Sequence, residues 1–194
     1  MSHSPAPDAG VAGLVEHAAA IRALAQAGAG DLQATLRDLR TVLLSADRIV
    51  MLVAPGSRDV VLDSAARLLA GNSPTLTPLL GHALREREQL GSTGIGRGVA
   101  IPHARSTAFR EPRAAFLRLS HPIDFSASDG QPVDLVFAMC VPDHQVEQHL
   151  QTLSGLVEHF SNADVRDDLR AAPDLARLRS LLLDAAPLAD TVRA

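Results

Sequence analysis

The chain of 194 residues is poor in aromatic side chains. It contains no tryptophan and no tyrosine, and aromatic residues make up only 3% of it. Proteins that bind single-stranded nucleic acids stack the bases on such rings. An excess of positive charge is also missing, because 18 Lys and Arg residues are outnumbered by 22 Asp and Glu residues, which leaves a formal net charge of −4. Binding to phosphate backbones requires a basic surface, so we expect no nucleic acid among the partners.

Cysteine and long apolar runs are equally scarce. Cys140 is the single cysteine, which excludes an internal disulfide and a metal site built from several thiolates. The longest apolar runs, Ile49 to Ala54 and Leu135 to Val141, are far shorter than the roughly 20 residues of a membrane-spanning helix. Asp8 and Glu16 interrupt the first thirty residues, which do not resemble a secretion signal. These absences predict a soluble, cytoplasmic protein with no membrane insertion.

Residues 1–37 are predicted to form an N-terminal tail followed by a helical extension. Apolar residues recur at helical spacing from Leu14 to Ala25, and Asp31 is a suitable N-cap for a second amphipathic helix. Such an extension would either pack on the main domain or serve as an arm for homodimerisation or partner docking. The sequence pattern does not distinguish these two hypotheses.

Residues 38–186 are predicted to form an α/β domain, followed by a short tail at 187–194. Four runs have the length and apolar character of strands, and helical periodicity separates them. The predicted strands are 48–54, 98–101, 114–119 and 135–141, the last of them central, and the predicted helices are 57–70, 76–90 and 142–160 with two shorter ones before residue 184. Strands mixed with helices, with long apolar runs, indicate a sheet covered on both faces.

Periodicity also predicts which side chains of the first two helices of this domain are buried. The expected buried residues are Val60, Val61, Ala65, Leu68 and Leu69 in helix 57–70, and Leu76, Leu79, Leu80, Ala83 and Leu84 in helix 76–90. Arg87 continues the second of these apolar faces, so its guanidinium is predicted to point into the domain. Arg85, Glu86 and Gln89 are predicted to face water.

A glycine-rich segment follows helix 76–90. Residues 91–98 contain four glycines together with Ser92 and Thr93, and such a segment can direct several N–H and O–H donors toward one anion. It is neither a P-loop, since the required lysine is missing, nor a dinucleotide fingerprint, since the glycines follow a helix and precede a strand. The glycines alone are equally compatible with a loop that merely crosses the edge of the sheet. Arg97 in this loop would either steer an acidic partner or be solvated.

Two histidines complete a candidate constellation. Pro102 cannot donate to a sheet, so it should end the strand and leave His103 at the carboxyl end, where reactive groups collect in α/β sheets. His149 lies on the apolar face of helix 142–160. Taken separately, an inward arginine such as Arg87 often only forms an ion pair with a carboxylate, and an inward histidine is often a core residue with its hydrogen bonds made. Together, Arg87, His103, His149 and the glycine-rich segment would suit a phosphorylated imidazole.

Three segments carry a specific resemblance. They read REQLGSTGIGRGVAIPHAR from Arg87, DGQPVDLVFAMCVP from Asp129 and HLQTLSGLVEHF from His149. This sequence closely resembles the fructose/mannitol-type (type 2) enzyme IIA domain of the bacterial phosphoenolpyruvate phosphotransferase system, and most of all its stand-alone nitrogen-regulatory branch. The resemblance is strong from residue 87 to 183, looser from 39 to 84, and absent before that.

The resemblance implies a fold, a chemistry and partners. The fold would be a mixed five-stranded sheet flanked by helices. His103 would be the phosphoryl acceptor, Arg87 the arginine that contacts the phosphoryl group and His149 the second active-site histidine, with Ser92, Thr93 and Gly94 beside them. A histidine phosphocarrier protein would be the donor, and either a IIB component or a regulated protein would lie downstream. The transfer would need neither a metal nor a cofactor.

The sequence leaves several functions open. It contains no IIB or IIC segment and has no room for a DNA-binding module, which favours a stand-alone regulator over a IIA protein of sugar uptake. A non-catalytic module that only docks on partners would be expected to lack the acceptor histidine. An enzyme that binds a small phosphorylated molecule has only the glycine-rich segment in its favour.

Overall fold

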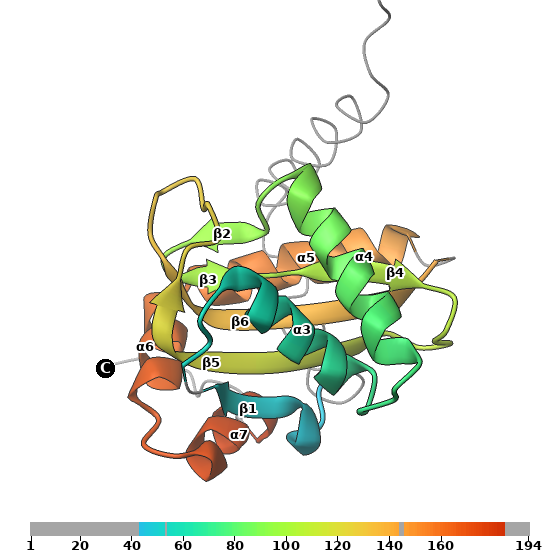
Figure 1. Cartoon of the computed structure of the whole chain (residues 1–194). Coiled ribbons are helices and arrows are strands. Elements are labelled where there is room, and N and C mark those ends of the chain that lie inside the picture. The colour runs from blue at the N-terminus through green and yellow to red at the C-terminus, as the bar shows by residue number, and fades with distance from the viewer. Residues whose placement is uncertain (1–42, 53, 144–145, 185–194) are drawn as a thin grey trace, which may run out of the picture.

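A computed structural model describes residues 43–52, 54–143 and 146–184. The predicted N-terminal extension 1–37 and the tail 187–194 lie outside these residues. In chain order the elements are η2 (Ala46–Arg48), β1 (Ile49–Leu52), α3 (Arg58–Leu69), α4 (Leu76–Leu90), β2 (Gly94–Gly96), β3 (Val99–Ala100), β4 (His103–Ser106), β5 (Arg113–Ile123), β6 (Val133–Pro142), α5 (Val146–Ser161), α6 (Ala163–Ala171) and α7 (Leu175–Leu183) (Figure 1).

The strands form one mixed sheet around β6. The main order is β1-β5-β6-β3-β2, and β4 also pairs with β6. β6 runs antiparallel to β5 and parallel to β3 and β4, and β1 is parallel to β5. Nearly every residue of β6 is buried, as expected for a strand covered on both faces. The mixed α/β fold and the central place of 135–141 are confirmed, with six strands in place of five.

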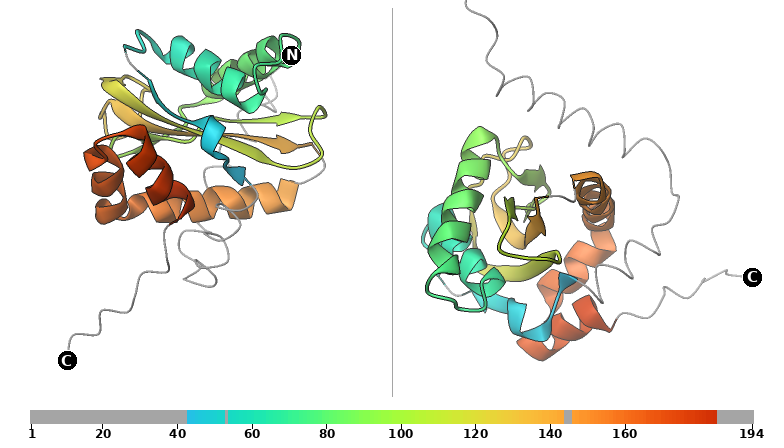
Figure 2. Two further views of the ribbon diagram at one scale, coloured as in Figure 1. Left: turned by 90° about the horizontal axis from the view of Figure 1, so that it is seen from below. Right: turned by 90° about the vertical axis from the view of Figure 1, so that its right-hand side faces the viewer.

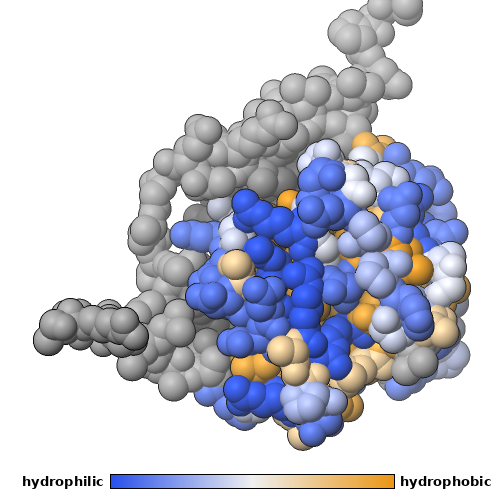
Figure 3. Space-filling view, turned by 90° about the vertical axis from the view of Figure 1, so that its left-hand side faces the viewer, coloured by the Kyte–Doolittle hydropathy of each residue, from blue (hydrophilic) through white to orange (hydrophobic). Residues whose placement is uncertain are grey.

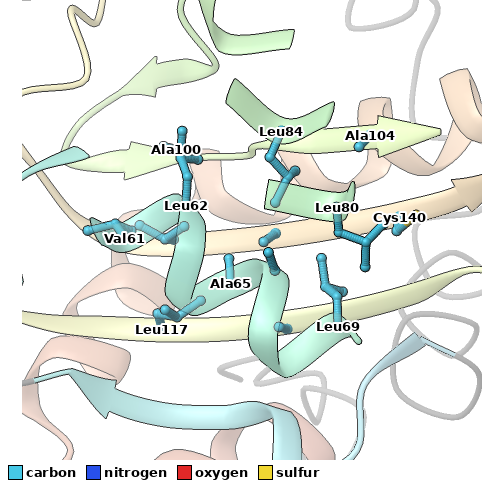
Figure 4. Close-up of a cluster of buried hydrophobic side chains, with 14 of the residues drawn as sticks. Val61, Leu62, Ala65, Leu69, Leu80, Leu84, Ala100, Ala104, Leu117 and Cys140 are labelled. Carbon is cyan, nitrogen blue, oxygen red and sulfur yellow. The ribbon is translucent and has the colours of Figure 1, made fainter. Parts of the chain in front are cut away.

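Helices cover both faces of the sheet (Figure 2). α3 and α4 lie on one face, where Leu62 of α3, Leu84 of α4 and Leu117 of β5 belong to one apolar cluster (Figure 4). α5, α6 and α7 contribute to the cluster on the other face, in which the ring of Phe160 stacks on Phe116 at 6.3 Å between centroids. Each helix layer buries the apolar stripe that its sequence periodicity supplies.

Two apolar side chains predicted to be buried are exposed instead. Val60 of α3 is 46% exposed and Leu79 of α4 is 65% exposed. The buried residues of α3 are Val61, Leu62, Ala65, Ala66 and Leu69, and those of α4 are Leu80, Gly81, Leu84 and Glu88. Each helix therefore faces the sheet about one residue, or 100°, further round than predicted. A wide apolar stripe allows both orientations, and packing on the sheet selects one.

The glycine-rich segment is partly a β-hairpin, which the sequence did not predict. β2 pairs antiparallel with β3, and the turn between them uses positive φ angles at Arg97 (56°) and Gly98 (77°). An oxygen of Asp129 accepts a hydrogen bond from the Arg97 amide at 2.7 Å and stabilises the turn. Glycine has a low strand propensity, so pairing with β3 determines this strand more than the composition of the segment does.

The interruption between β3 and β4 corrects the predicted place of His103. His103 does not follow the end of the strand; it is the first residue of β4. Pro102 lacks an amide hydrogen, but Ala100 and His103 keep the same register on β6, opposite Val136 and Met139. The proline therefore splits one line of pairing into two short strands, and His103 lies at the break.

Within residues 43–52, 54–143 and 146–184, no helix has the length and hydropathy needed to cross a bilayer. Figure 3 shows one face of the molecule, on which hydrophilic residues predominate and apolar patches are small and scattered.

Candidate functional site

Helix α4 and strand β4 bring together two of the predicted residues, Arg87 and His103. Arg87 lies in the last turn of α4, which packs on β4. Its Nε donates a hydrogen bond to Nε2 of His103 at 2.9 Å. The other nitrogen of the imidazole, Nδ1, lies 2.8 Å from the carbonyl oxygen of Ile101. The two side chains are thus in direct contact although sixteen positions separate them in the chain.

These two contacts determine the tautomer of His103. A guanidinium nitrogen can only donate, so Nε2 must present its lone pair to Arg87. A carbonyl oxygen can only accept, so Nδ1 must carry the hydrogen. The imidazole is therefore neutral, with its nucleophilic nitrogen directed at the arginine. His103 is 7% exposed, so only a small part of its surface is accessible to a reaction partner.

Arg87 supplies positive charge at this nitrogen. Its Nη1 donates to the carbonyl oxygen of Gly91 at 2.8 Å, which anchors the guanidinium across the end of α4. Burial lowers the pKa of Arg87, and the negative charge of Glu88 opposes this effect. An arginine remains a cation at neutral pH. Its two hydrogen bonds to described residues use two of its five N–H groups.

Glu88 is a buried acidic residue that the sequence analysis did not single out. It is 5% exposed, and both carboxylate oxygens accept from the amide of Thr93, at 3.1 and 3.3 Å. Its Oε2 also accepts from the Thr93 hydroxyl at 2.5 Å. The available signal was periodicity, since Glu88 follows Leu80 and Leu84 at eight and four residues. A charged residue at that spacing in an apolar stripe indicates a buried partner.

The donors of residues 92–94 contact acceptors of the protein itself. The Ser92 hydroxyl donates to the Phe125 carbonyl oxygen at 2.6 Å and accepts from the Gly94 amide at 3.0 Å. Thr93 is buried and donates to Glu88. The segment is therefore held at both ends, by α4 on one side and by the loop after β5 on the other.

The remaining candidates lie elsewhere or outside the described side chains. His149 belongs to α5, but its side chain lies outside the described residues, so its predicted approach to His103 stays a prediction. Arg97 is exposed and donates to the Ser161 carbonyl oxygen at 3.1 Å. Cys140 is buried in β6, where burial above all raises the pKa of its thiol to about 12. Among the side chains that the structure covers, no cluster of three His, Cys, Asp or Glu residues is suited to a metal ion.

Comparison with known proteins finds the same family along the whole described part of the chain. Residues 42–185 match the family model for the phosphoenolpyruvate-dependent sugar phosphotransferase system, EIIA 2. The nitrogen regulatory protein of Pseudomonas aeruginosa is 41% identical over 143 residues, which are 73% of this chain and 93% of that protein. The fructose-specific EIIA component of Haloferax volcanii is 40% identical over 102 residues, 53% of this chain and 66% of that protein.

A solved structure agrees with this similarity. The crystal structure of the nitrogen regulatory protein IIA-Ntr from Neisseria meningitidis superimposes with a TM-score of 0.66 at 35% sequence identity. The match covers 72% of this chain and 96% of the Neisseria chain.

Proposed function

Because the chain belongs to the EIIA 2 family of the phosphoenolpyruvate-dependent sugar phosphotransferase system, we propose that it carries a phosphoryl group on Nε2 of His103. A histidine phosphocarrier protein would be the donor. The observation that carries this proposal is the pairing of Arg87 with Nε2, which presents a lone pair and a cation at the same point. A nucleophile beside a fixed positive charge is what the transfer of an anionic phosphoryl group requires.

The transfer balances without an added proton donor or acceptor. The bond between phosphorus and the imidazole nitrogen of the donor breaks, with its electron pair left on that nitrogen, and a bond between phosphorus and Nε2 of His103 forms. A donor ring that carries hydrogen on its other nitrogen thereby leaves as a neutral imidazole. The hydrogen on Nδ1 stays in place, so the phosphorylated ring of His103 becomes positively charged. The carbonyl oxygen of Ile101, which accepts from Nδ1 at 2.8 Å, stabilises that charge.

Arg87 would stabilise the transferred group. The guanidinium leaves Nε2 when the phosphoryl group arrives and donates to its oxygens instead, exchanging a neutral acceptor for a charged one. Charge-assisted hydrogen bonds of this kind are about twice as strong as neutral ones. The same charge favours the transition state, in which negative charge is spread over the three equatorial oxygens.

The other predicted residues take their places around this pair in the proposal. His149 would be the second histidine of the site and would contact the phosphoryl group from α5. Ser92, Thr93 and Gly94 would form the wall of the phosphoryl site. Because their hydroxyl and amide donors are bonded within the protein, a direct bond to phosphate would require them to exchange partners.

We favour a nitrogen-regulatory role, in which the phosphorylation state of His103 controls other proteins. The relatives at 41% and 35% identity are nitrogen regulatory proteins, and this chain aligns with most of the length of each. The second candidate is a sugar-specific IIA that passes the group to a IIB partner, which the similarity to the fructose-specific component supports. Phosphate transfer to a purified IIB protein distinguishes the two.

The test of the acceptor is the intact mass of the protein after incubation with phosphoenolpyruvate, enzyme I and a histidine phosphocarrier protein. We expect one acid-labile phosphoryl adduct on the wild type and none on His103→Ala. His121→Ala is a control, because His121 is an exposed histidine at the far end of β5. An unmodified wild type beside a phosphorylated carrier, or an adduct that survives His103→Ala, refutes the proposal.

A further inference from the structure

We propose that Glu88 is a positioning residue that holds His103 in its reactive tautomer and orientation, an inference that rests on the proposed function of His103. Glu88 acts on the imidazole indirectly. It acts through Thr93, whose amide and hydroxyl both donate to its carboxylate. The carboxylate is buried within the protein rather than directed to solvent, so it has no role in binding a substrate directly.

A closed circuit of hydrogen bonds joins Glu88 to both nitrogens of His103. On one side the carbonyl oxygen of Thr93 accepts from the Ile101 amide at 2.9 Å, and the Ile101 carbonyl oxygen accepts from Nδ1 of His103. On the other side Arg87, the neighbour of Glu88 in α4, donates to Nε2. The circuit therefore leaves α4 through Glu88, passes through Thr93, Ile101 and His103, and returns to α4 through Arg87.

A second set of bonds ties the end of α4 to the same circuit. The Gly91 amide donates to the backbone carbonyl oxygen of Glu88 at 3.3 Å, and the Gly91 carbonyl oxygen accepts from Arg87. The segment between Glu88 and Thr93 is thus held at Gly91 and at Thr93. If the carboxylate is removed, Gly91 remains attached, but Thr93, and through it Ile101, loses its hydrogen bonds to Glu88 of the helix.

Loss of the bonds between Glu88 and Thr93 would affect the imidazole of His103. A neutral histidine has two tautomers of similar energy, and the partners of its nitrogens select one. Displacement of the Ile101 carbonyl oxygen weakens the selection of hydrogen on Nδ1. Molecules with hydrogen on Nε2 have no lone pair at that nitrogen to attack phosphorus. A shift of about 1 Å in such a site can reduce a rate by about 100-fold.

The alternative is that Glu88 acts only as a charge. Arg58 approaches it, with Nη1 at 4.0 Å from Oε1, and Glu88 opposes the lowering of the Arg87 pKa. Two substitutions of Glu88 separate the effect of its charge from the effect of its side-chain length. Glu88→Gln removes the charge but keeps the length, an acceptor for the Thr93 amide and a donor for its hydroxyl. Glu88→Asp keeps the charge but is one methylene too short to maintain the contacts with Thr93.

The experiment measures single-turnover phosphoryl transfer from a phosphorylated histidine phosphocarrier protein, and the tautomer of His103 by ¹⁵N NMR of the unphosphorylated protein. We expect Glu88→Gln to transfer within about threefold of the wild type, and Glu88→Asp and Glu88→Ala to be slower by about 100-fold. The slow variants should show a new signal for hydrogen on Nε2. Glu86→Gln is the matched control, because Glu86 is exposed on the same helix, and it should leave both readouts unchanged.

The opposite pattern would overturn the inference. A fast Glu88→Asp with a slow Glu88→Gln would mean that charge acts and position does not, and an unchanged tautomer in Glu88→Asp would exclude the circuit. If Glu88→Ala does not fold, the Gln and Asp pair decides alone. A wild type that accepts no phosphoryl group refutes the proposed function, whereas the tautomer spectra still test the positioning role of Glu88.

Discussion

The hydrogen bond between Arg87 and His103 has opposite effects before and during the proposed reaction. In the resting protein the arginine occupies the lone pair of Nε2 that would attack phosphorus. This bond must break before transfer, and the guanidinium regains more than it loses only when phosphoryl oxygens are within reach. The proposed acceptor is therefore shielded until a donor arrives with its own negative charge.

Replacement of Arg87 tests this account at the scale of one residue. We expect Arg87→Ala to slow phosphoryl transfer by about 100- to 1,000-fold, the effect of removing one preorganised donor from a transition state. Arg87→Lys should recover only part of this loss, because an ammonium keeps the charge but not the planar fork of donors. The rates are measured by stopping the transfer reaction at successive times and determining the phosphorylated fraction from the intact mass.

The matched control for Arg87 is Arg85→Ala. Arg85 lies two residues earlier in α4 and forms an ion pair with Asp63 at the surface. Its loss should leave the transfer rate unchanged. A wild-type rate in Arg87→Ala, with normal folding, would refute the role assigned to Arg87.

At the scale of an element, the β2–β3 hairpin depends on close approach at Gly94. A Cβ atom at this position would lie 2.8 Å from the Cβ of Ala127 and 3.1 Å from its Cα. The absence of a side chain allows the loop after β5 to pack directly on β2. That packing also brings the Phe125 carbonyl oxygen to the Ser92 hydroxyl. Glycine is required here by contact rather than by its backbone angles.

Gly94→Ala should therefore destabilise the fold through overpacking. We expect a loss of about 1 to 3 kcal/mol in the free energy of unfolding, measured by urea denaturation. The second change Ala127→Gly removes the atom nearest to the new methyl group and should recover part of the loss. A Gly94→Ala protein as stable as the wild type, or a double variant that recovers nothing, would contradict this explanation.

At the scale of the whole molecule, Cys140 reports on the unfolding of the central strand. It lies fully buried in β6, and burial, reinforced by the negative charge of Asp143, raises the pKa of its thiol to about 12 from an ordinary value near 9. The sequence contains no lysine and no tyrosine. The side chains that usually dominate titration between pH 9 and 11 are therefore missing, and the thiol is isolated there.

The direction in which stability changes with pH follows from the difference in thiol pKa between the folded and the unfolded chain. Between pH 9 and 12 the unfolded chain loses the thiol proton and the folded chain keeps it, so unfolding becomes easier as pH rises. We expect the free energy of unfolding to fall by about 1.4 kcal/mol per pH unit above pH 9 relative to Cys140→Ala. Urea denaturation at pH 8 to 11 measures both slopes. Equal slopes in the two proteins would show that Cys140 does not titrate on unfolding.

Much of the fold follows from signals that are local in the chain. Ser57 caps α3 at the start of the helix predicted from residue 57, with its hydroxyl accepting from the Val60 amide at 3.3 Å. The helix predicted at 76–90 has those bounds in the structure, and the apolar run 135–141 forms most of the central strand β6. Caps, helical spacing and continuous apolar runs act within a few residues, which is why the sequence alone reveals them.

The sequence by itself determined the helices of the domain, four of its strands, the covered sheet and the family to which the motif around His103 belongs. Only the tertiary structure decided which nitrogen of His103 faces Arg87, that Glu88 is buried against Thr93, and that Val60 and Leu79 face outward. Periodicity places a residue on a helix face but not the helix on its sheet. Contacts between α4, the hairpin and β4 join residues distant in sequence, and they form only when long-range packing has set the position and rotation of each element.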